Sequence, residues 1–125
     1  PVARNVDQLS LETLSRITRE LRARARRNSA SISECDGGIM TLASLESYHL
    51  RAFRAIVKPG ESATLTLPAA QPYLISSSSR GKKSCAQLAW QLSLIADRRL
   101  VSEALAAKFL SKIVAFLERP VCLMG

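Results

Sequence analysis

The chain has 125 residues, of which 47% are hydrophobic, and it carries a net charge of +8 with a pI near 10.1. Such a chain is long enough for one domain with one core, and its composition excludes general disorder, a membrane span and a CxxC metal site. The excess of lysine and arginine over acidic residues favours nucleic acid, or an acidic membrane or protein surface, as the partner.

Residues 10–27, SLETLSRITRELRARARR, fit two secondary structures. As a helix, they place apolar side chains every three or four positions, with Ser10 as the N-cap and the arginines on the opposite side. As strands, they alternate apolar residues with Arg22, Arg24 and Arg26. Local evidence favours the helix, and the strands remain the alternative. Six arginines and one acidic residue between positions 16 and 27 favour contact with phosphates.

The middle of the chain predicts strands separated by turns. The Asp-Gly-Gly turn at 36–38 precedes the predicted strands Ile39–Leu45 and Tyr48–Val57. Lys58–Glu61, KPGE, has proline and glycine where a tight turn takes them. Ala63–Leu67, ATLTL, alternates and is rich in threonine, as strands prefer. These segments predict a hairpin of 52–57 with 62–67 around the KPGE turn.

The last third of the chain changes from a period of two to the period of a helix. After Ser76–Ser84, which has the composition of an exposed loop, residues 85–96 alternate as one strand. Its apolar side chains share one face, while Gln87, Gln91 and Ser93 form an uncharged face suited to hydrogen bonds with sugar, phosphate or bases. A helical stripe through residues 85, 88, 92 and 95 is the alternative. Residues 97–119 then predict one long helix or two, beginning at Asp97.

Signs of catalysis are weak in this sequence. His49 is the sole histidine, and no acidic residue near it suggests a catalytic pair. The segment 80–84, RGKKS, lacks the first glycine of a phosphate loop and precedes a strand rather than a helix. We therefore expect no enzyme activity, no cofactor, no metal and no small-molecule substrate.

With these elements placed, residues 48–120 resemble a coat protein of the single-stranded RNA bacteriophages. The likeness lies in the order of a strand, a turn, a strand ATLTL, a long loop, the strand CAQLAWQLSLIA and a final helical run. It implies an α+β fold, in which an antiparallel β-sheet is followed by two C-terminal helices that pack on one sheet face of an intertwined dimer. In one domain of residues 1–125, segment 1–36 would be helical or extended, 37–96 the sheet and 97–119 the helices.

The resemblance also implies a structural function. Such a protein dimerises, assembles into the icosahedral capsid of a virion in the host cytoplasm, and packages single-stranded RNA on its sheet face. Its partners would be RNA and further copies of itself, with no membrane. The implied RNA-binding residues are Arg22, Arg24, Arg26, His49, Arg51, Gln87, Gln91 and Ser93, and the implied inter-dimer loop contains Ser78, Arg80, Gly81, Lys82 and Lys83.

Two other functions are compatible with the same features. One is a small double-stranded-RNA-binding domain of helix–three strands–helix order, in which Lys82 and Lys83 would open the second helix and bind phosphates. The other is a protein-interaction module whose basic face meets an acidic partner.

Overall fold

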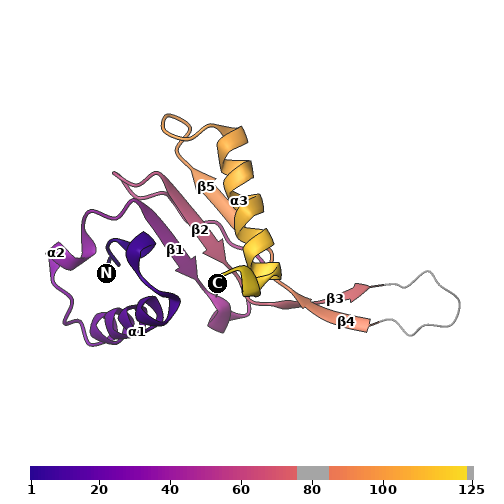
Figure 1. Ribbon diagram of the computed structural model, residues 1–125, viewed down its shortest axis with the longest axis horizontal. Helices are drawn as coiled ribbons and strands as arrows, with labels where there is room; N and C mark the ends of the chain where they lie inside the picture. The colour runs from indigo at the N-terminus through magenta and orange to yellow at the C-terminus, as the bar shows by residue number, and fades with distance from the viewer. Residues whose placement is uncertain (76–84, 124–125) are drawn as a thin grey trace, which may run out of the picture. The chain divides into compact units, whose positions relative to one another are not determined.

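The computed structural model describes residues 1–75 and 85–123 (Figure 1). The chain divides into two compact units. Unit 1 combines Pro1–Ile39 with Val101–Gly125, and unit 2 is Met40–Leu100. The single domain predicted from the length stays a prediction. No helix in the described ranges is long and apolar enough to cross a membrane.

Helix α1, Leu11–Arg26, is the main element in the N-terminal part of unit 1. Its N-cap is Ser10, whose hydroxyl accepts a hydrogen bond from the backbone N–H of Thr13 at 3.2 Å. The predicted helix is therefore confirmed, and the strand alternative for residues 10–27 was wrong. The apolar residues recur with helical spacing, so they share one side of the helix and leave the arginines exposed.

A short helix, α2 (Ile32–Cys35), follows α1 and is tied to the N-terminal segment. The Arg4 guanidinium donates hydrogen bonds to the carbonyls of Ser33 and Asp36, at 3.3 and 2.9 Å. The N-terminal segment also contains a 3₁₀ turn, η1 (Val6–Gln8). These bonds hold together two segments that are about 30 residues apart in the sequence.

Helix α3, Glu103–Glu118, provides the C-terminal part of unit 1 and is followed by a 3₁₀ turn, η3 (Pro120–Leu123). Its N-cap is Ser102, which accepts a hydrogen bond from the N–H of Leu105 at 3.3 Å. Asp97 was therefore the wrong cap, because residues 97–100 form a turn instead. The described C-terminal region has one α-helix, so of the two alternatives for residues 97–119 the single helix is observed, and the two helices that the resemblance implied were wrong.

Unit 2 contains a three-stranded mixed sheet in the order β1–β2–β5. Strand β1 (Met40–Ser44) runs parallel to β2 (Ala63–Leu67), and β5 (Ser93–Ala96) runs antiparallel to β2. The predicted hairpin around KPGE was wrong, because β1 and β5 occupy the two edges of β2. The predicted strand 48–57 does not form either. The chain crosses from β1 to the parallel strand β2 there, with one 3₁₀ turn, η2 (Glu46–Tyr48).

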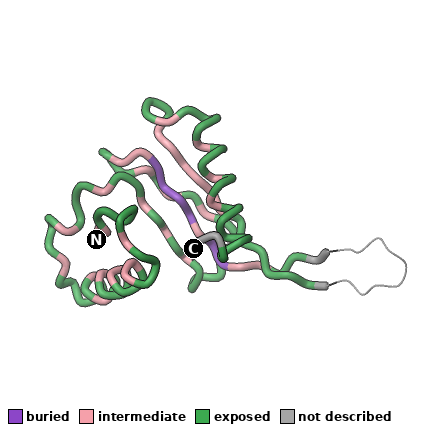
Figure 2. Tube along the Cα trace, viewed as in Figure 1, coloured by how far each residue is buried: buried purple, intermediate pink, exposed green. Residues whose placement is uncertain are grey.

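The core of the described residues lies on β2, the central strand (Figure 2). Leu65 is 7% exposed, and Thr64 and Thr66 are fully buried. The Thr66 hydroxyl lies 3.2 Å from the carbonyl oxygens of both Phe53 and Ser93, to which it donates. These bonds attach the extended segment after η2 to the sheet.

Strands β3 (Gln71–Ile75) and β4 (Cys85–Ala89) form a separate antiparallel pair, which we call the ribbon. The ribbon extends away from the three-stranded sheet of unit 2 (Figure 1). The single strand predicted for residues 85–96 is thus divided at residues 90–92, because β4 pairs with β3 whereas β5 pairs with β2. Leu88 and Trp90 belong to the apolar face of that predicted strand, which the resemblance placed beneath the helices, but they are 68% and 55% exposed.

Candidate functional site

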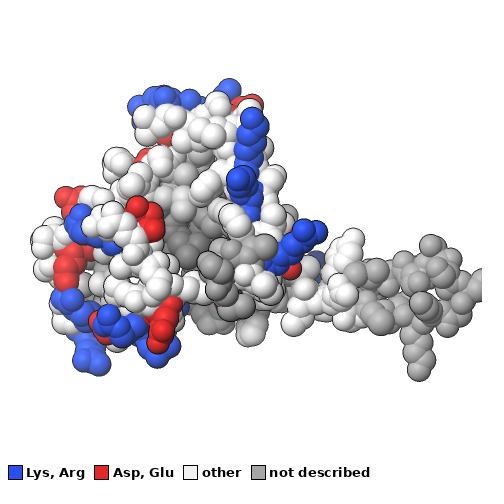
Figure 3. Space-filling view, in the orientation of Figure 1, with Lys and Arg blue, Asp and Glu red and all other residues white. Residues whose placement is uncertain are grey.

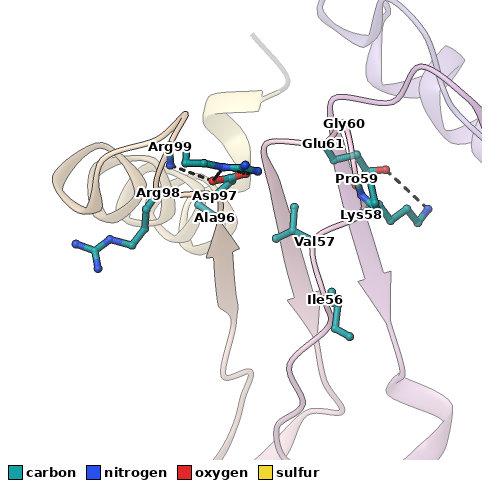
Figure 4. A pocket seen from close by; sticks show the side chains of 10 residues that line it. All are labelled: Ile56, Val57, Lys58, Pro59, Gly60, Glu61, Ala96, Asp97, Arg98 and Arg99. Carbon is teal, nitrogen blue, oxygen red and sulfur yellow. Dashed lines mark hydrogen bonds and ion pairs between the residues drawn. The ribbon is translucent and has the colours of Figure 1, made fainter.

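The first candidate site is a groove in unit 2, where the turn before β2 meets the end of β5 (Figure 4). Its volume is about 510 Å³. Backbone pairing fixes both walls, since the N–H of Asp97 donates to the carbonyl of Ser62 at 2.9 Å and so prolongs the β2–β5 ladder. The groove is lined by Ile56, Val57, Lys58, Pro59, Gly60, Glu61, Ala96, Asp97, Arg98 and Arg99.

One wall of the groove is the predicted KPGE turn, which is confirmed. The N–H of Glu61 donates to the carbonyl of Lys58 at 3.0 Å, and Gly60 has a φ of 86°, which glycine adopts without strain. The carboxylate of Glu61 accepts a hydrogen bond from the Thr41 hydroxyl and lies 3.8 Å from the Lys58 ammonium. Figure 4 shows the Lys58 side chain turned toward Glu61.

The other wall is the turn that follows β5. Asp97 accepts hydrogen bonds from the backbone N–H of Arg99 at 2.9 Å and from its guanidinium, with the shortest contact 2.7 Å. The side-chain hydrogen bonds from Arg99 are the main reason that the pKa of Asp97 falls from 3.8 to about 2. Arg98, between them, points away from this pair (Figure 4).

Charged side chains dominate the lining of this groove. Its lining contains three cationic and two acidic side chains, and both acids already contact a cation. The lining contains no serine, cysteine or histidine. Because its cations outnumber its carboxylates, and both carboxylates are already paired with a cation, such a groove suits an anionic group.

A second groove, of about 430 Å³, lies at the base of the ribbon. It combines aromatic, amide and guanidinium groups, and its two aromatic residues, Tyr73 and Trp90, are 65% and 55% exposed. Its lining is Arg51, Gln71, Pro72, Tyr73, Ala89, Trp90 and Gln91.

The residues predicted to bind RNA are divided between the two units. The arginines at 22, 24 and 26 lie on α1 in unit 1, where Arg24 pairs with Glu34. In unit 2, His49 follows η2, Gln87 lies on β4 and Ser93 lies on β5. Within unit 2, Arg51 and Gln91 of this set both line the second groove. The predicted inter-dimer loop residues, 78 and 80–83, lie outside the described residues.

Sequence reasoning missed the Asp97–Arg99 pair and the exposed aromatic residues of the second groove. An acidic residue two positions before an arginine, directly after a strand, was the available signal for the pair. In the described ranges, no group of three or more His, Cys, Asp or Glu side chains could hold a metal ion.

Comparison with known proteins now assigns the fold. The family model of the 2-oxoacid dehydrogenases acyltransferase (catalytic domain) matches residues 1–125. The chain belongs to this family. The resemblance to phage coat proteins was therefore wrong, and the strand 48–57 on which it partly rested does not form. The fold is that of the acyltransferase catalytic core, with three helices and mixed sheets, and not a coat-protein dimer.

Relatives of this acyltransferase-family chain are components of pyruvate dehydrogenase complexes. The mitochondrial dihydrolipoyllysine-residue acetyltransferase of Schizosaccharomyces pombe is 28% identical over 124 residues, which cover 99% of this chain and 26% of the relative. The corresponding component of Rickettsia bellii is 30% identical and is covered to 29%. Chloroplastic component 5 of Arabidopsis thaliana is 30% identical and is covered to 25%. The chain thus spans under a third of these relatives.

Solved structures share the fold of this chain over its whole length. The Azotobacter vinelandii dihydrolipoamide acetyltransferase (E2p) has a TM-score of 0.83 at 31% identity, and the cubic core of the pyruvate dehydrogenase multienzyme complex has 0.84 at 31%. Each match covers 100% of this chain and 50% of the solved chain. The A. vinelandii structure was determined to define the roles in catalysis of a serine, a histidine and an asparagine four residues after the histidine.

These findings correct the functional predictions. The relatives are acetyltransferases, so the expectation of a non-catalytic protein without a small-molecule substrate was wrong. A coat protein, a double-stranded-RNA-binding domain and a basic interaction module are all unsupported, as is RNA as the partner. The capsid, virion and host-cytoplasm predictions were wrong too, because the relatives include mitochondrial and chloroplastic components of metabolic complexes.

Proposed function

We propose that this chain is part of the acyltransferase core of a 2-oxoacid dehydrogenase complex, where an acyl group passes between the dihydrolipoyl thiol and coenzyme A. The observation that carries the proposal is the match of the family model to residues 1–125. The TM-score of 0.84 to a cubic complex core supports the same conclusion and indicates further copies of the chain as partners.

Acyl transfer between thiols replaces one thioester by another. The incoming thiol gives up its proton, its sulfur attacks the acyl carbonyl carbon, and the departing sulfur takes up a proton. The lining of the first groove contains Lys58, Arg98 and Arg99. Guanidinium and ammonium groups bind phosphate strongly, so the phosphates of coenzyme A would compete there with Glu61 and Asp97, which pair with Lys58 and Arg99. The lining of this groove contains no histidine, so we assign the proton transfer to residues outside the groove.

A histidine has a catalytic role in the A. vinelandii relative, together with an asparagine four residues later. In this chain the sole histidine is His49, and the residue four positions later is Phe53. His49 is exposed and has a left-handed backbone, with a φ of 54°. We infer that the histidine used for acyl transfer comes from polypeptide outside residues 1–125, and that His49 does not take its place.

The test uses the complex that contains the chain. A tagged chain is isolated from its source, and transfer of the acetyl group from acetyl-CoA to dihydrolipoamide is measured on the purified material. We expect other 2-oxoacid dehydrogenase subunits and acetyl transfer to co-purify with the tag. Purified material that lacks both would overturn the proposal.

The inference about His49 is tested by a substitution in the same acetyl-transfer assay. We expect His49→Ala to retain kcat within about twofold of the parent, because general-base catalysis by a histidine typically contributes 10²–10⁴-fold. A hundredfold loss of kcat in a complex that still assembles would contradict the inference and leave the complex assignment intact.

A further inference from the structure

The second groove, at the base of the ribbon, is built by three separate segments of unit 2. Residues 71–73 come from β3, and residues 89–91 come from the end of β4 and the stretch that follows it. Arg51 comes from the segment after η2. The N–H of Ala69 donates to the carbonyl of Leu50 at 3.0 Å, so a backbone hydrogen bond holds this segment beside the start of the ribbon.

Aromatic rings and amides make up much of the lining of this groove. Tyr73 is 65% exposed and Trp90 is 55% exposed, so both rings are accessible to a ligand. An accessible aromatic ring is a surface on which a nucleobase stacks. Gln71 and Gln91 add two side-chain amides, and each amide has the donor and acceptor atoms that bind the edge of a base.

The groove also contains one cation. Among the described residues that line it, Arg51 alone is charged. Residues 71–75 and 85–91 contain no lysine, arginine, aspartate or glutamate, and the described part of the ribbon is accordingly white at the right of Figure 3. Within the described ranges the Arg51 guanidinium has no acidic partner. It is therefore available to bind a phosphate group, which a guanidinium contacts through two parallel hydrogen bonds.

The two grooves of unit 2 differ in this respect. In the first groove, the carboxylates of Glu61 and Asp97 already contact Lys58 and Arg99. In the second groove, the lining contains no carboxylate that would compete with a phosphate for Arg51. Its volume of about 430 Å³ also lies within the usual range of small-molecule sites.

We propose that the second groove binds a nucleoside phosphate. One molecule of this class carries a flat base for the aromatic rings, polar atoms on the edge of that base for the amides, and a phosphate for Arg51. The site is additional to the first groove, and the inference does not depend on the proposed function.

The fluorescence of Trp90 provides a direct measurement, because Trp90 is the sole tryptophan of the chain. We expect AMP, added to the full chain, to quench this emission to saturation as the base stacks on the indole. Adenosine lacks the phosphate and should bind about tenfold more weakly, because it loses the charge-assisted hydrogen bonds with Arg51. Inorganic phosphate lacks the base and should leave the emission unchanged.

Substitutions separate the phosphate contact from stacking. Arg51→Gln should weaken binding of AMP by about tenfold or more and leave binding of adenosine within about twofold of the parent. Arg54→Gln is the matched control, since Arg54 is exposed on the same segment and lies outside the lining. It should leave binding of AMP within about twofold. Tyr73→Leu should weaken AMP and adenosine alike, by about fivefold or more.

Coenzyme A separates two sources of the same chemistry, because it also carries an adenosine phosphate. Binding of AMP that coenzyme A does not displace identifies a free nucleotide as the ligand. Displacement by coenzyme A, with the same dependence on Arg51, shows that its adenosine end occupies the groove. Both results support a nucleoside-phosphate site.

Three outcomes would overturn the inference. These are emission that does not change at millimolar AMP, adenosine that binds as tightly as AMP, and an Arg54→Gln variant that loses as much affinity for AMP as Arg51→Gln does. None of them bears on acetyl transfer by the isolated complex. Conversely, binding of AMP by a chain whose complex lacks acetyl transfer would count against the proposed function alone.

Discussion

In strand β2 and in the ribbon, the burial of a side chain does not follow its hydrophobicity. The sequence ATLTL of β2 contains two threonines, yet both are fully buried. The sequence CAQLAWQ of β4 and the next two residues contains leucine and tryptophan, yet Leu88 and Trp90 are more than half exposed. The difference is the number of neighbours, because β2 has a strand on each edge whereas β4 has one partner. Position in the sheet therefore decides burial here more than residue type does.

The strongest test of this contrast is one substitution made in both places. Leu65→Ala should lower the free energy of unfolding by about 2–5 kcal/mol, because it leaves a cavity in the core. Leu65 is 7% exposed, whereas Leu88 is 68% exposed, so Leu88→Ala should cost less than about 0.5 kcal/mol. Urea denaturation followed by circular dichroism, at concentrations below self-association, gives both values. Equal losses would refute the contrast.

Substitution of the two buried threonines of β2 should change the free energy of unfolding by smaller and different amounts. Thr66→Val should cost about 1–2 kcal/mol, because its hydroxyl donates to the carbonyls of Phe53 and Ser93. The Thr64 hydroxyl is buried without a hydrogen-bond partner in the described structure, so Thr64→Val should be neutral or stabilising. The same urea experiment measures both variants, and a destabilised Thr64→Val would show that the hydroxyl has a partner in solution.

The smallest expected effect on stability comes from Asp97, in the turn that directly follows β5. The hydrogen bonds from Arg99 lower the pKa of Asp97 to about 2, so the folded state favours the ionised carboxylate. This contribution to stability is present above about pH 4 and is lost as the pH falls from 4 toward 2. Asp97→Asn should therefore flatten the fall of the urea midpoint in this range, and Asp7→Asn, at an exposed site, should leave it unchanged.

Sequence reasoning succeeded where adjacent residues determine the structure. The cap at Ser10 and the spacing that follows it predict α1, and alternation over Ala63–Leu67 predicts β2 with the bounds observed. The turn with Gly60 also follows from the four residues that form it. Each of these elements depends on contacts within a few positions of the chain.

Pairing between distant segments was beyond the same reasoning. The register joins Met40 to Ala63, and nothing in either segment specifies a parallel neighbour. Alternation over residues 85–96 showed which side chains share a face but not that the strand changes partner at Trp90. The candidate groove was missed for the same reason, because its walls come from segments more than 30 residues apart. The order of elements alone then suggested the wrong family.

The short connection between β4 and β5 has a mechanical consequence. Three residues, 90–92, separate the end of the ribbon from the strand that carries Asp97 at its far end. Fully extended, they span only about 10 Å. Because the connection is this short, the position of the ribbon limits where β5 can begin, and β5 in turn places Asp97 at the wall of the first groove.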